Sequence, residues 1–398
     1  MIALIKIAAV IALMLILISR KINLTYALAA GSILTGILFG RGLGIFIDIY
    51  LTLADSQTLT LLLVFVSVLY LSNMLTDTGI LREMLASLER MIKDLRLVTF
   101  SMPLLIGLVP APSGAMLSAP FARETGQKIG LKPERMLVIN YWFRHITEYI
   151  NPIYPGPILT TAIVGITFKS LFFMNLPIML TVFMTGLAMF ILTIRHSRNT
   201  EKPARGDLMR IAKAIWPVLL AIILPIAFKV NIALSVLASV ALASLVHRIP
   251  PTPARIRKSF QADLLLLVFL VMYFKTVLHS SNAIEAIAQS LAGTSPLIVI
   301  ILVPAIIGFL TGMTIAYVGL GFPLLIPLFN SGGELNQTLV MLAFVSGYMG
   351  ILLSPMHLCL SVTQKYFGAD YRKIYGLLLP AVAVVCLATA LLVTIGWP

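Results

Sequence analysis

The sequence predicts an all-α integral membrane protein built from two inverted-topology repeats. Hydrophobic residues make up 59% of the 398 residues and charged residues only 11%, whereas a soluble domain usually carries about a quarter charged residues. The second observation is internal similarity. Asn151-Pro152 has a counterpart in Ser354-Pro355, and the same offset of 203 residues recurs across most of the chain. Internal repeats of this kind are typical of secondary transporters.

Apolar runs long enough to cross about 30 Å of hydrocarbon occur in both halves of the chain. A short linker at 201–210 separates the repeats, and we expect it to be cytoplasmic. The first repeat, 1–200, is predicted to cross the membrane at 2–19, 24–40, 58–75, 136–168 and 171–194. The second repeat, 211–398, is predicted to cross at 211–228, 232–246, 264–278, 338–363 and 374–395. In each repeat the fourth crossing is discontinuous at its X-Pro step.

Two further regions, about 97–121 and 296–327, are interrupted by proline and glycine and are predicted to be re-entrant hairpins. This topology puts most of the 29 Lys and Arg residues on one side: two at 20–21, six in 195–213, three in 365–373, and four each in 82–96, 123–135 and 248–258. The positive-inside bias identifies that side as cytoplasmic and places both termini outside. The net charge of +14 is therefore a topology signal. The sequence contains no basic domain of the kind that would indicate a nucleic-acid partner.

The binding chemistry is expected where helices are broken at membrane depth. Irregular backbone survives there only when it is buried in protein or lines a watery cavity. Half-helix N-termini suit an anion, and unwound carbonyls suit a cation. The alternative at each break is a proline kink or a packing glycine. The predicted substrate-binding residues at the hairpin tips and breaks are Pro112, Ser113, Gly114, Asn151, Pro152, Thr311, Gly312, Thr314, Ser354 and Pro355.

Charged residues inside the spans give a second indication of function. Arg144 and Glu148 are one helical turn apart and share a face. We expect Arg144 to be the countercharge for an anion, with Glu148, His145 or His357 carrying a coupling ion. The alternatives are a structural ion pair and packing histidines. Cys359 lies in an apolar segment and receives no role, and the sequence predicts no metal site and no cofactor.

The paired hairpins and broken helices resemble the ion-transporter superfamily, which includes divalent-anion/sodium symporters, gluconate and citrate permeases and arsenite-pump membrane subunits. Within it, segments 111–116 (APSGAM) and 353–357 (LSPMH) resemble an uncharacterised prokaryotic family of integral membrane proteins. The resemblance implies a homodimer in which hairpins and broken helices carry the substrate as an elevator. Sodium-coupled members bear Ser-Asn-Thr signatures at these tips. The tips here differ, so the coupling ion stays open between H⁺ and Na⁺.

These observations predict a secondary active transporter of a small anion, an organic carboxylate, in the inner or plasma membrane. The protein is not expected to be an enzyme. An anion channel is one alternative, because pores also use broken helices. An intramembrane serine protease is another, because Ser113 and His357 superficially offer a nucleophile and a base.

Overall fold

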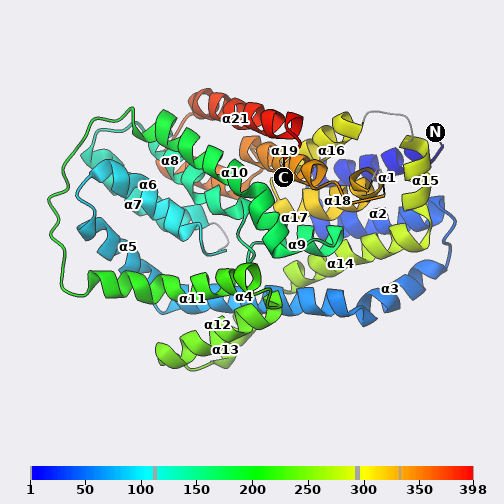
Figure 1. Cartoon of the computed structure of the whole chain (residues 1–398), viewed down its shortest axis with the longest axis horizontal. Coiled ribbons are helices and arrows are strands. Elements are labelled where there is room, and N and C mark those ends of the chain that lie inside the picture. Colours follow the sequence, from blue (N-terminus) through cyan, green and yellow to red (C-terminus); the bar gives the residue numbers. More distant parts are fainter. Residues whose placement is uncertain (1, 111–113, 292–295, 331–332, 398) are drawn as a thin grey trace.

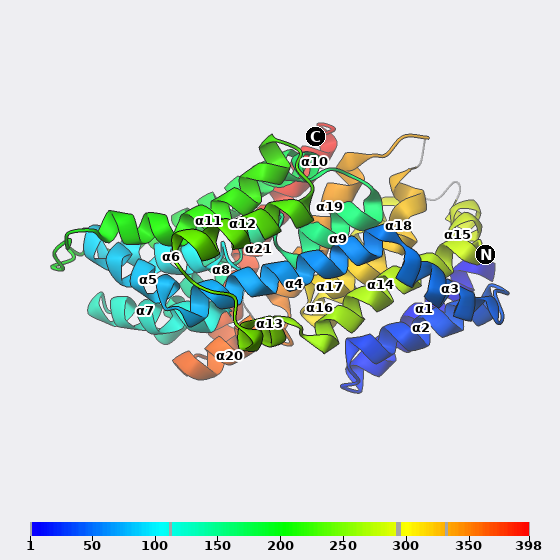
Figure 2. The same ribbon diagram turned by 90° about the horizontal axis from the view of Figure 1, so that it is seen from below.

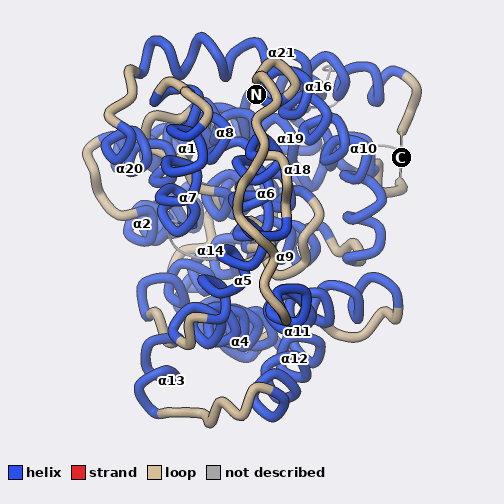
Figure 3. The backbone as a smooth tube through the Cα atoms, turned by 90° about the vertical axis from the view of Figure 1, so that its left-hand side faces the viewer, coloured by secondary structure: helices blue, strands red, loops and turns tan. Residues whose placement is uncertain are grey.

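The computed structural model describes residues 2–110, 114–291, 296–330 and 333–397. In these ranges every regular element is a helix, and the one β-bridge is an isolated pair between Asp94 and Arg198. Figure 3 shows helices joined by loops, with no strand in the described part of the chain. The predicted all-α class is confirmed.

Thirteen helical segments lie within residues 2–227, including one 3-10 helix (η1), one π-helix (η2) and α11, which follows the linker and belongs to the second half. They are α1 (Ile2–Ser19), α2 (Leu24–Leu38), α3 (Gly44–Ala54), α4 (Ser56–Asp77), α5 (Ile80–Met91), α6 (Leu95–Ile106), α7 (Gly114–Lys128), α8 (Pro133–Arg144), η1 (Ile146–Tyr149), α9 (Pro155–Val164), α10 (Phe168–Gly186), η2 (Leu187–Ile191) and α11 (Asp207–Ala227).

The remaining helical segments include a second π-helix (η3). They are α12 (Ile232–Val246), α13 (Pro253–Ser259), α14 (Ala262–Ser280), α15 (Ala283–Leu291), α16 (Pro296–Thr311), α17 (Thr314–Ala316), η3 (Tyr317–Gly321), α18 (Phe322–Phe329), α19 (Gln337–Leu353), α20 (Leu358–Phe367) and α21 (Tyr371–Thr394).

Seven segments of the described chain are long and apolar enough to cross a membrane. They are α1, α4, α10 with η2, α11, α14, α19 with α20, and α21. Large apolar side chains also point outward, such as Leu245 at 74% and Leu387 at 72% exposure. An apolar outer surface suits lipid rather than water. The chain is therefore a membrane-embedded protein, whereas the number and direction of its crossings stay predictions.

The molecule is elongated, and helices from both halves interleave along it. In Figures 1 and 2, α5, α6 and α7 lie at one end of the long axis, α1, α2 and α15 lie at the other, and α4 runs between them. Helices far apart in sequence pack together: α2 on α14, α4 on α12, α1 on α15, and α5 on α11. Neither half of the chain is thus a separate body.

Both predicted hairpin regions form packed helix pairs. α6 contacts α7 and both contact α8, while α16 packs along α19 and against η3. α7 continues to Lys128, beyond the expected limit near 121. The apolar run ends before Arg123 and Glu124. Both residues favour a helix, so α7 continues into the polar segment.

The first broken helix is interrupted earlier than expected. α8 ends at Arg144, and a 3-10 turn, η1, extends the segment to Tyr149. The hydroxyl of Thr147 in this turn donates a hydrogen bond to the carbonyl of Gly107. In the second half, α19 remains α-helical to Leu353 and ends directly before Ser354.

The segment that directly precedes the linker is hydrogen-bonded to the rest of the protein. Asn199 Nδ2 donates to the carbonyls of Glu89 (2.6 Å) and Ile92 (2.9 Å). Partial burial raises the pKa of Asp94, but hydrogen bonds from Arg96 and His196 outweigh it and hold that pKa at about 2. These contacts attach residues 196–199 to the α5–α6 turn.

Two glycines at the hairpin–helix contacts should not tolerate a side chain. A Cβ on Gly107 would lie 2.4 Å from the backbone oxygen of Arg144, and one on Gly308 would lie 2.3 Å from that of Gly347. Because the obstacle is backbone, we expect alanine at either position to lower the free energy of unfolding by about 1–3 kcal/mol. Thermal unfolding of the purified protein in detergent measures the effect.

The matched control is Gly376→Ala in α21, where a Cβ meets nothing within 4 Å. Alanine in an open helical position should be neutral or slightly stabilising. If Gly107→Ala melted at the temperature of Gly376→Ala, the backbone contact would not be as close as described.

Candidate functional site

The first helix break holds the end of α6 through side-chain hydrogen bonds. The hydroxyl of Tyr154 donates to the carbonyl oxygens of Gly107, at 2.8 Å, and Val109, at 3.1 Å. Asn151 Nδ2 donates to the carbonyl of Leu108 at 3.0 Å. These three carbonyls lie directly after α6, where no further helical turn offers them amide donors, so the side chains of the break satisfy them.

Arg144 and Glu148 form a buried ion pair. Arg144 Nη1 lies 3.0 Å from Glu148 Oε1, and the side chains are only 3% and 12% exposed. Tyr348 donates to Glu148 Oε2 at 2.8 Å, and the guanidinium carbon lies 5.6 Å from the ring centroid of Tyr154. Arg144 Nε is buried with no hydrogen-bond partner among the described residues. The arginine therefore keeps one donor for another group.

The first residue of α7 lies against this guanidinium group. A Cβ on Gly114 would be 2.6 Å from both Nε and Nη2 of Arg144. The absence of a side chain on Gly114 permits this close approach between the start of α7 and the arginine. Pro112 and Ser113 lie outside the described residues.

The tip of the second hairpin lies against the second helix break. Gly312 has φ +65°, and its carbonyl lies 2.7 Å from His357 Nδ1. A Cβ on Gly312 would be 2.6 Å from the His357 backbone. Thr314 approaches α9, because a Cβ on Gly156 would be 3.3 Å from the Thr314 Cβ. The hydroxyl of Thr311 donates a hydrogen bond to the carbonyl of Ile307 in the preceding turn of α16.

Asn151 and Ser354 take similar local roles at the two breaks. Asn151 Oδ1 accepts from the amide of Ile153 at 3.2 Å, and Ser354 Oγ accepts from that of Met356 at 3.1 Å. Both side chains are buried. The prolines differ, since Pro152 is buried and Pro355 is exposed. Asn151 and Ser354 thus hold the turns in shape.

A histidine from each half of the chain takes part in a contact between the two helix breaks. His145 Nε2 lies 3.0 Å from His357 Nε2. The Sγ of Cys359 belongs to the same cluster, whose candidate ligand atoms all lie within 4.8 Å of one another. His145 follows α8, whereas His357 and Cys359 begin α20.

The structure therefore brings the predicted residues together in two adjacent groups. Gly114, Arg144 and Glu148 form one, and His145, His357 and Gly312 form the other. Sequence reasoning missed Tyr154, Tyr348 and Cys359. The repeat offset was an available signal for Tyr154, which lies 203 residues before His357.

An all-helical fold with apolar helices of membrane length and buried polar groups at helix interruptions defines the class: a membrane-embedded helical protein. The chain belongs to the family described as "Protein of unknown function (DUF401)", whose model matches residues 2–396. No curated protein matches the chain. The expected membership of an uncharacterised family is confirmed, whereas the wider superfamily stays a prediction.

The buried ion pair predicts a specific pattern of stability. Glu148→Gln leaves the Arg144 charge buried and unpaired, and we expect a loss of about 3–5 kcal/mol in the free energy of unfolding. Tyr348→Phe removes one hydrogen bond to a charged group and should cost about 1.5–3 kcal/mol. Denaturant unfolding in detergent micelles measures both.

The control is the uncharged double variant Arg144→Gln/Glu148→Gln. It removes both charges, so it should recover much of the stability lost in Glu148→Gln. A double variant less stable than Glu148→Gln would mean that the two charges do not act as a pair.

Proposed function

We propose that the protein is a secondary active transporter of a small organic anion of the carboxylate class, with its substrate site at the Arg144 end of α8. The observation that carries the proposal is the buried guanidinium group with an unpartnered Nε, in contact with the first residue of a helix. An arginine and a helix N-terminus both favour a carboxylate.

Other buried donors near this point support a polar ligand. Among the described residues, the hydroxyls of Tyr149 and Tyr317 are buried without a hydrogen-bond partner. The Tyr149 ring lies 4.4 Å from the ring of Tyr348, the residue that donates to Glu148. Leaving a buried hydroxyl unpaired costs about 1–3 kcal/mol, and a bound polar molecule removes that cost.

Glu148 gives a physical route to ion coupling. Its carboxylate binds Nη1 of Arg144, so a substrate carboxylate at Nε shares the positive charge of the arginine with it. A cation, H⁺ or Na⁺, that neutralises Glu148 weakens this pair and releases the arginine for the anion. Substrate and coupling ion then favour each other, which is the thermodynamic requirement for symport.

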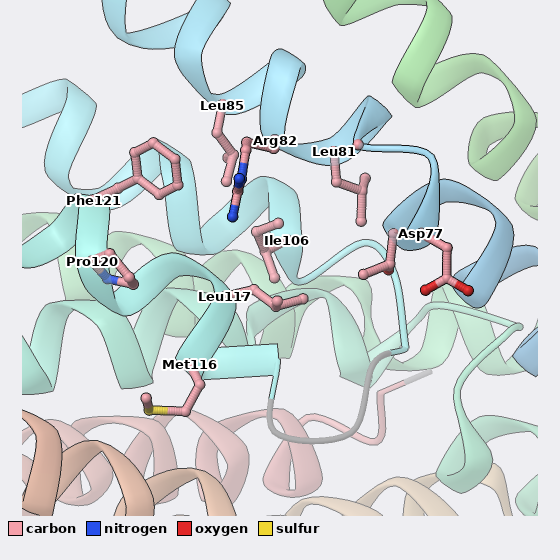
Figure 4. Close-up of a pocket in the computed structure, with 11 residues that line it drawn as sticks. Asp77, Leu81, Arg82, Leu85, Ile106, Met116, Leu117, Pro120 and Phe121 are labelled. Carbon is pink, nitrogen blue, oxygen red and sulfur yellow. The ribbon is translucent and has the colours of Figure 1, made fainter.

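A cavity next to the first hairpin supports an access route. It has a volume of about 540 Å³ and is lined by the end of α4, α5, the end of α6 and the first turns of α7. In Figure 4 the Arg82 side chain points into it, toward Ile106 and Leu117. Its volume lies within the ordinary range for small-molecule sites. A cation in such a cavity attracts anions.

Several matched features support two structural repeats. Asn23 and Asn231 cap α2 and α12 by accepting from the amide two residues on. Gly165 and Gly368 end α9 and α20 with positive φ. Most specifically, the bond from Tyr154 to the Val109 carbonyl matches that from His357 to the Gly312 carbonyl, each partner displaced by 203 residues.

An elevator mechanism follows from this proposal. The hairpins pack against the broken helices, α6 and α7 on α8 and α16 on α19. A second layer of contacts joins α2 to α14 and α4 to α12. We propose that the first set moves as one unit against the second, in a homodimer within the inner or plasma membrane, as in the ion-transporter superfamily that the chain resembles.

Binding of an anion should stabilise the wild-type protein against heat. At a concentration of 100 times Kd, a ligand raises the free energy of unfolding by about 2.7 kcal/mol. A thermal-shift screen of mono-, di- and tricarboxylates and oxyanions, with and without sodium and at two pH values, tests this. We expect one carboxylate class to raise Tm in the wild type and in Lys132→Gln, an exposed cation at the start of α8.

The double variant Arg144→Gln/Glu148→Gln should lose that shift, because it lacks the arginine but buries no unpaired charge. A shift that survived in the double variant would remove Arg144 from the site. No shift with any anion in the wild type would count against an anion transporter.

The proposed topology predicts which loops meet the outside of the cell. In a variant lacking both native cysteines, Lys132→Cys should be shielded from an impermeant maleimide, and Lys229→Cys should react. Both positions are at loops between helices, and both should react after permeabilisation. Labelling of Lys132→Cys in intact cells would refute the re-entrant arrangement of 97–121.

A further inference from the structure

The two facing histidines have a defined proton arrangement. His145 Nδ1 lies 2.6 Å from the carbonyl oxygen of Tyr141, and His357 Nδ1 lies 2.7 Å from that of Gly312. A carbonyl oxygen only accepts hydrogen bonds, so the Nδ1 atom of each ring carries the proton. In a neutral ring the other nitrogen, Nε2, then presents a lone pair.

These two lone pairs face each other across 3.0 Å between His145 Nε2 and His357 Nε2. Two acceptors at that distance repel unless a cation lies between or beside them. A shared proton satisfies the histidines alone, but it gives no role to the third group of the cluster, the Cys359 Sγ. Imidazole nitrogens and a thiolate are all ligands that zinc accepts in proteins.

We propose that His145, His357 and Cys359 form a buried site for a borderline-soft divalent metal ion of the zinc class. The hydrogen bonds at both Nδ1 atoms are those that metal-binding histidines generally make, to fix the ring and leave Nε2 for the ion. With zinc–nitrogen bonds of 2.0–2.1 Å, a tetrahedral site separates the two nitrogens by about 3.3 Å. The rings therefore need to part by a few tenths of an ångström, and the Cys359 Sγ, which lies within 4.8 Å of the two nitrogens, has to approach them.

The site has three protein ligands, which leaves the fourth position open. A divalent ion with one thiolate carries a net charge of +1, so an anionic fourth ligand would bring the buried site to neutrality. His357 is half-buried, so the cluster is not fully enclosed by the protein. Sites with an open position are those at which a metal binds exogenous ligands.

The ion would join segments that are more than 200 residues apart. His145 lies just after α8, and the other two ligands begin α20. One metal ion would fix the first helix break to the second. This inference does not depend on the proposed transport activity, since its test requires no substrate.

Cobalt binding tests the site in the purified full-length protein under reducing conditions. Tetrahedral Co²⁺ with a thiolate ligand has intense visible d–d bands and a near-ultraviolet charge-transfer band. We expect wild type to bind one Co²⁺ per chain with both signals, Zn²⁺ to displace it, and Mg²⁺, which prefers oxygen ligands, to leave it in place. A wild type without saturable cobalt absorption would leave only a shared proton and would overturn the proposal.

The two cysteines of the chain provide a matched pair of variants. Cys359→Ser should lose the charge-transfer band and bind Co²⁺ at least tenfold more weakly. Cys386→Ser should keep both, because Cys386 is exposed in α21 and outside the cluster. A band that persists in Cys359→Ser, or disappears in Cys386→Ser, contradicts the assignment.

Folding of the variants is controlled independently. If Cys359→Ser does not give folded protein, His357→Asn should weaken Co²⁺ binding in its place. Zinc should also raise the Tm of wild type, and a chelator should reverse the shift. A wild-type Tm that is unaffected by zinc and chelator would overturn the proposal without any variant.

Discussion

Backbone groups released at a helix interruption have no water to bind inside an apolar interior, and each needs a protein partner. This constraint places the side chains around the two breaks. Tyr154 and Asn151 satisfy the carbonyls of 107–109, and His357 satisfies that of Gly312. Because these bonds fix each hairpin end to its neighbouring break, they also fix α8, and with it the position of Arg144.

The contacts of the two hairpins are complementary in size. Gly114 lies against the long side chain of Arg144, whereas in the second half the large Tyr317 lies against Gly347. Tyr317 and Gly347 lie 203 residues after Gly114 and Arg144. A large side chain is therefore present once in each pair, on opposite partners. The consequence is chemical asymmetry, because the first hairpin carries the charge and the second carries an aromatic ring.

Tyr348 connects the Arg144–Glu148 ion pair to the histidine cluster. The Tyr348 hydroxyl lies 2.8 Å from Glu148 Oε2 and 3.2 Å from the carbonyl oxygen of His145. A change at the ion pair therefore reaches the backbone of the histidine cluster directly. A metal ion that joined His145 to α20, as proposed, would restrict movement between the two breaks.

The sequence predicted much of the arrangement of elements but fewer of the contacts. Composition and hydropathy predicted the all-α class and membrane-length helices, since lipid contact requires apolar runs that are visible without a structure. They did not predict α3 or α5. α5 contains Arg82, Glu83 and Arg90 beside its apolar face. The mean hydropathy of the segment is therefore too low to predict a membrane span, although its apolar residues recur with a helical period.

For the candidate site, the sequence by itself predicted helix interruptions around Asn151-Pro152 and Ser354-Pro355, because proline and glycine act locally through φ and the missing amide hydrogen. Only the structure showed that α8 already ends at Arg144. The sequence also predicted that Arg144 and Glu148 lie close together, from their spacing of four residues, and the two form an ion pair although Glu148 lies in the 3-10 turn after α8. Only the tertiary structure decided that Tyr348 binds Glu148 and that Cys359 joins His145 and His357. These partners are about 200 residues apart, and their proximity depends on how the two halves pack, which no local rule of sequence specifies.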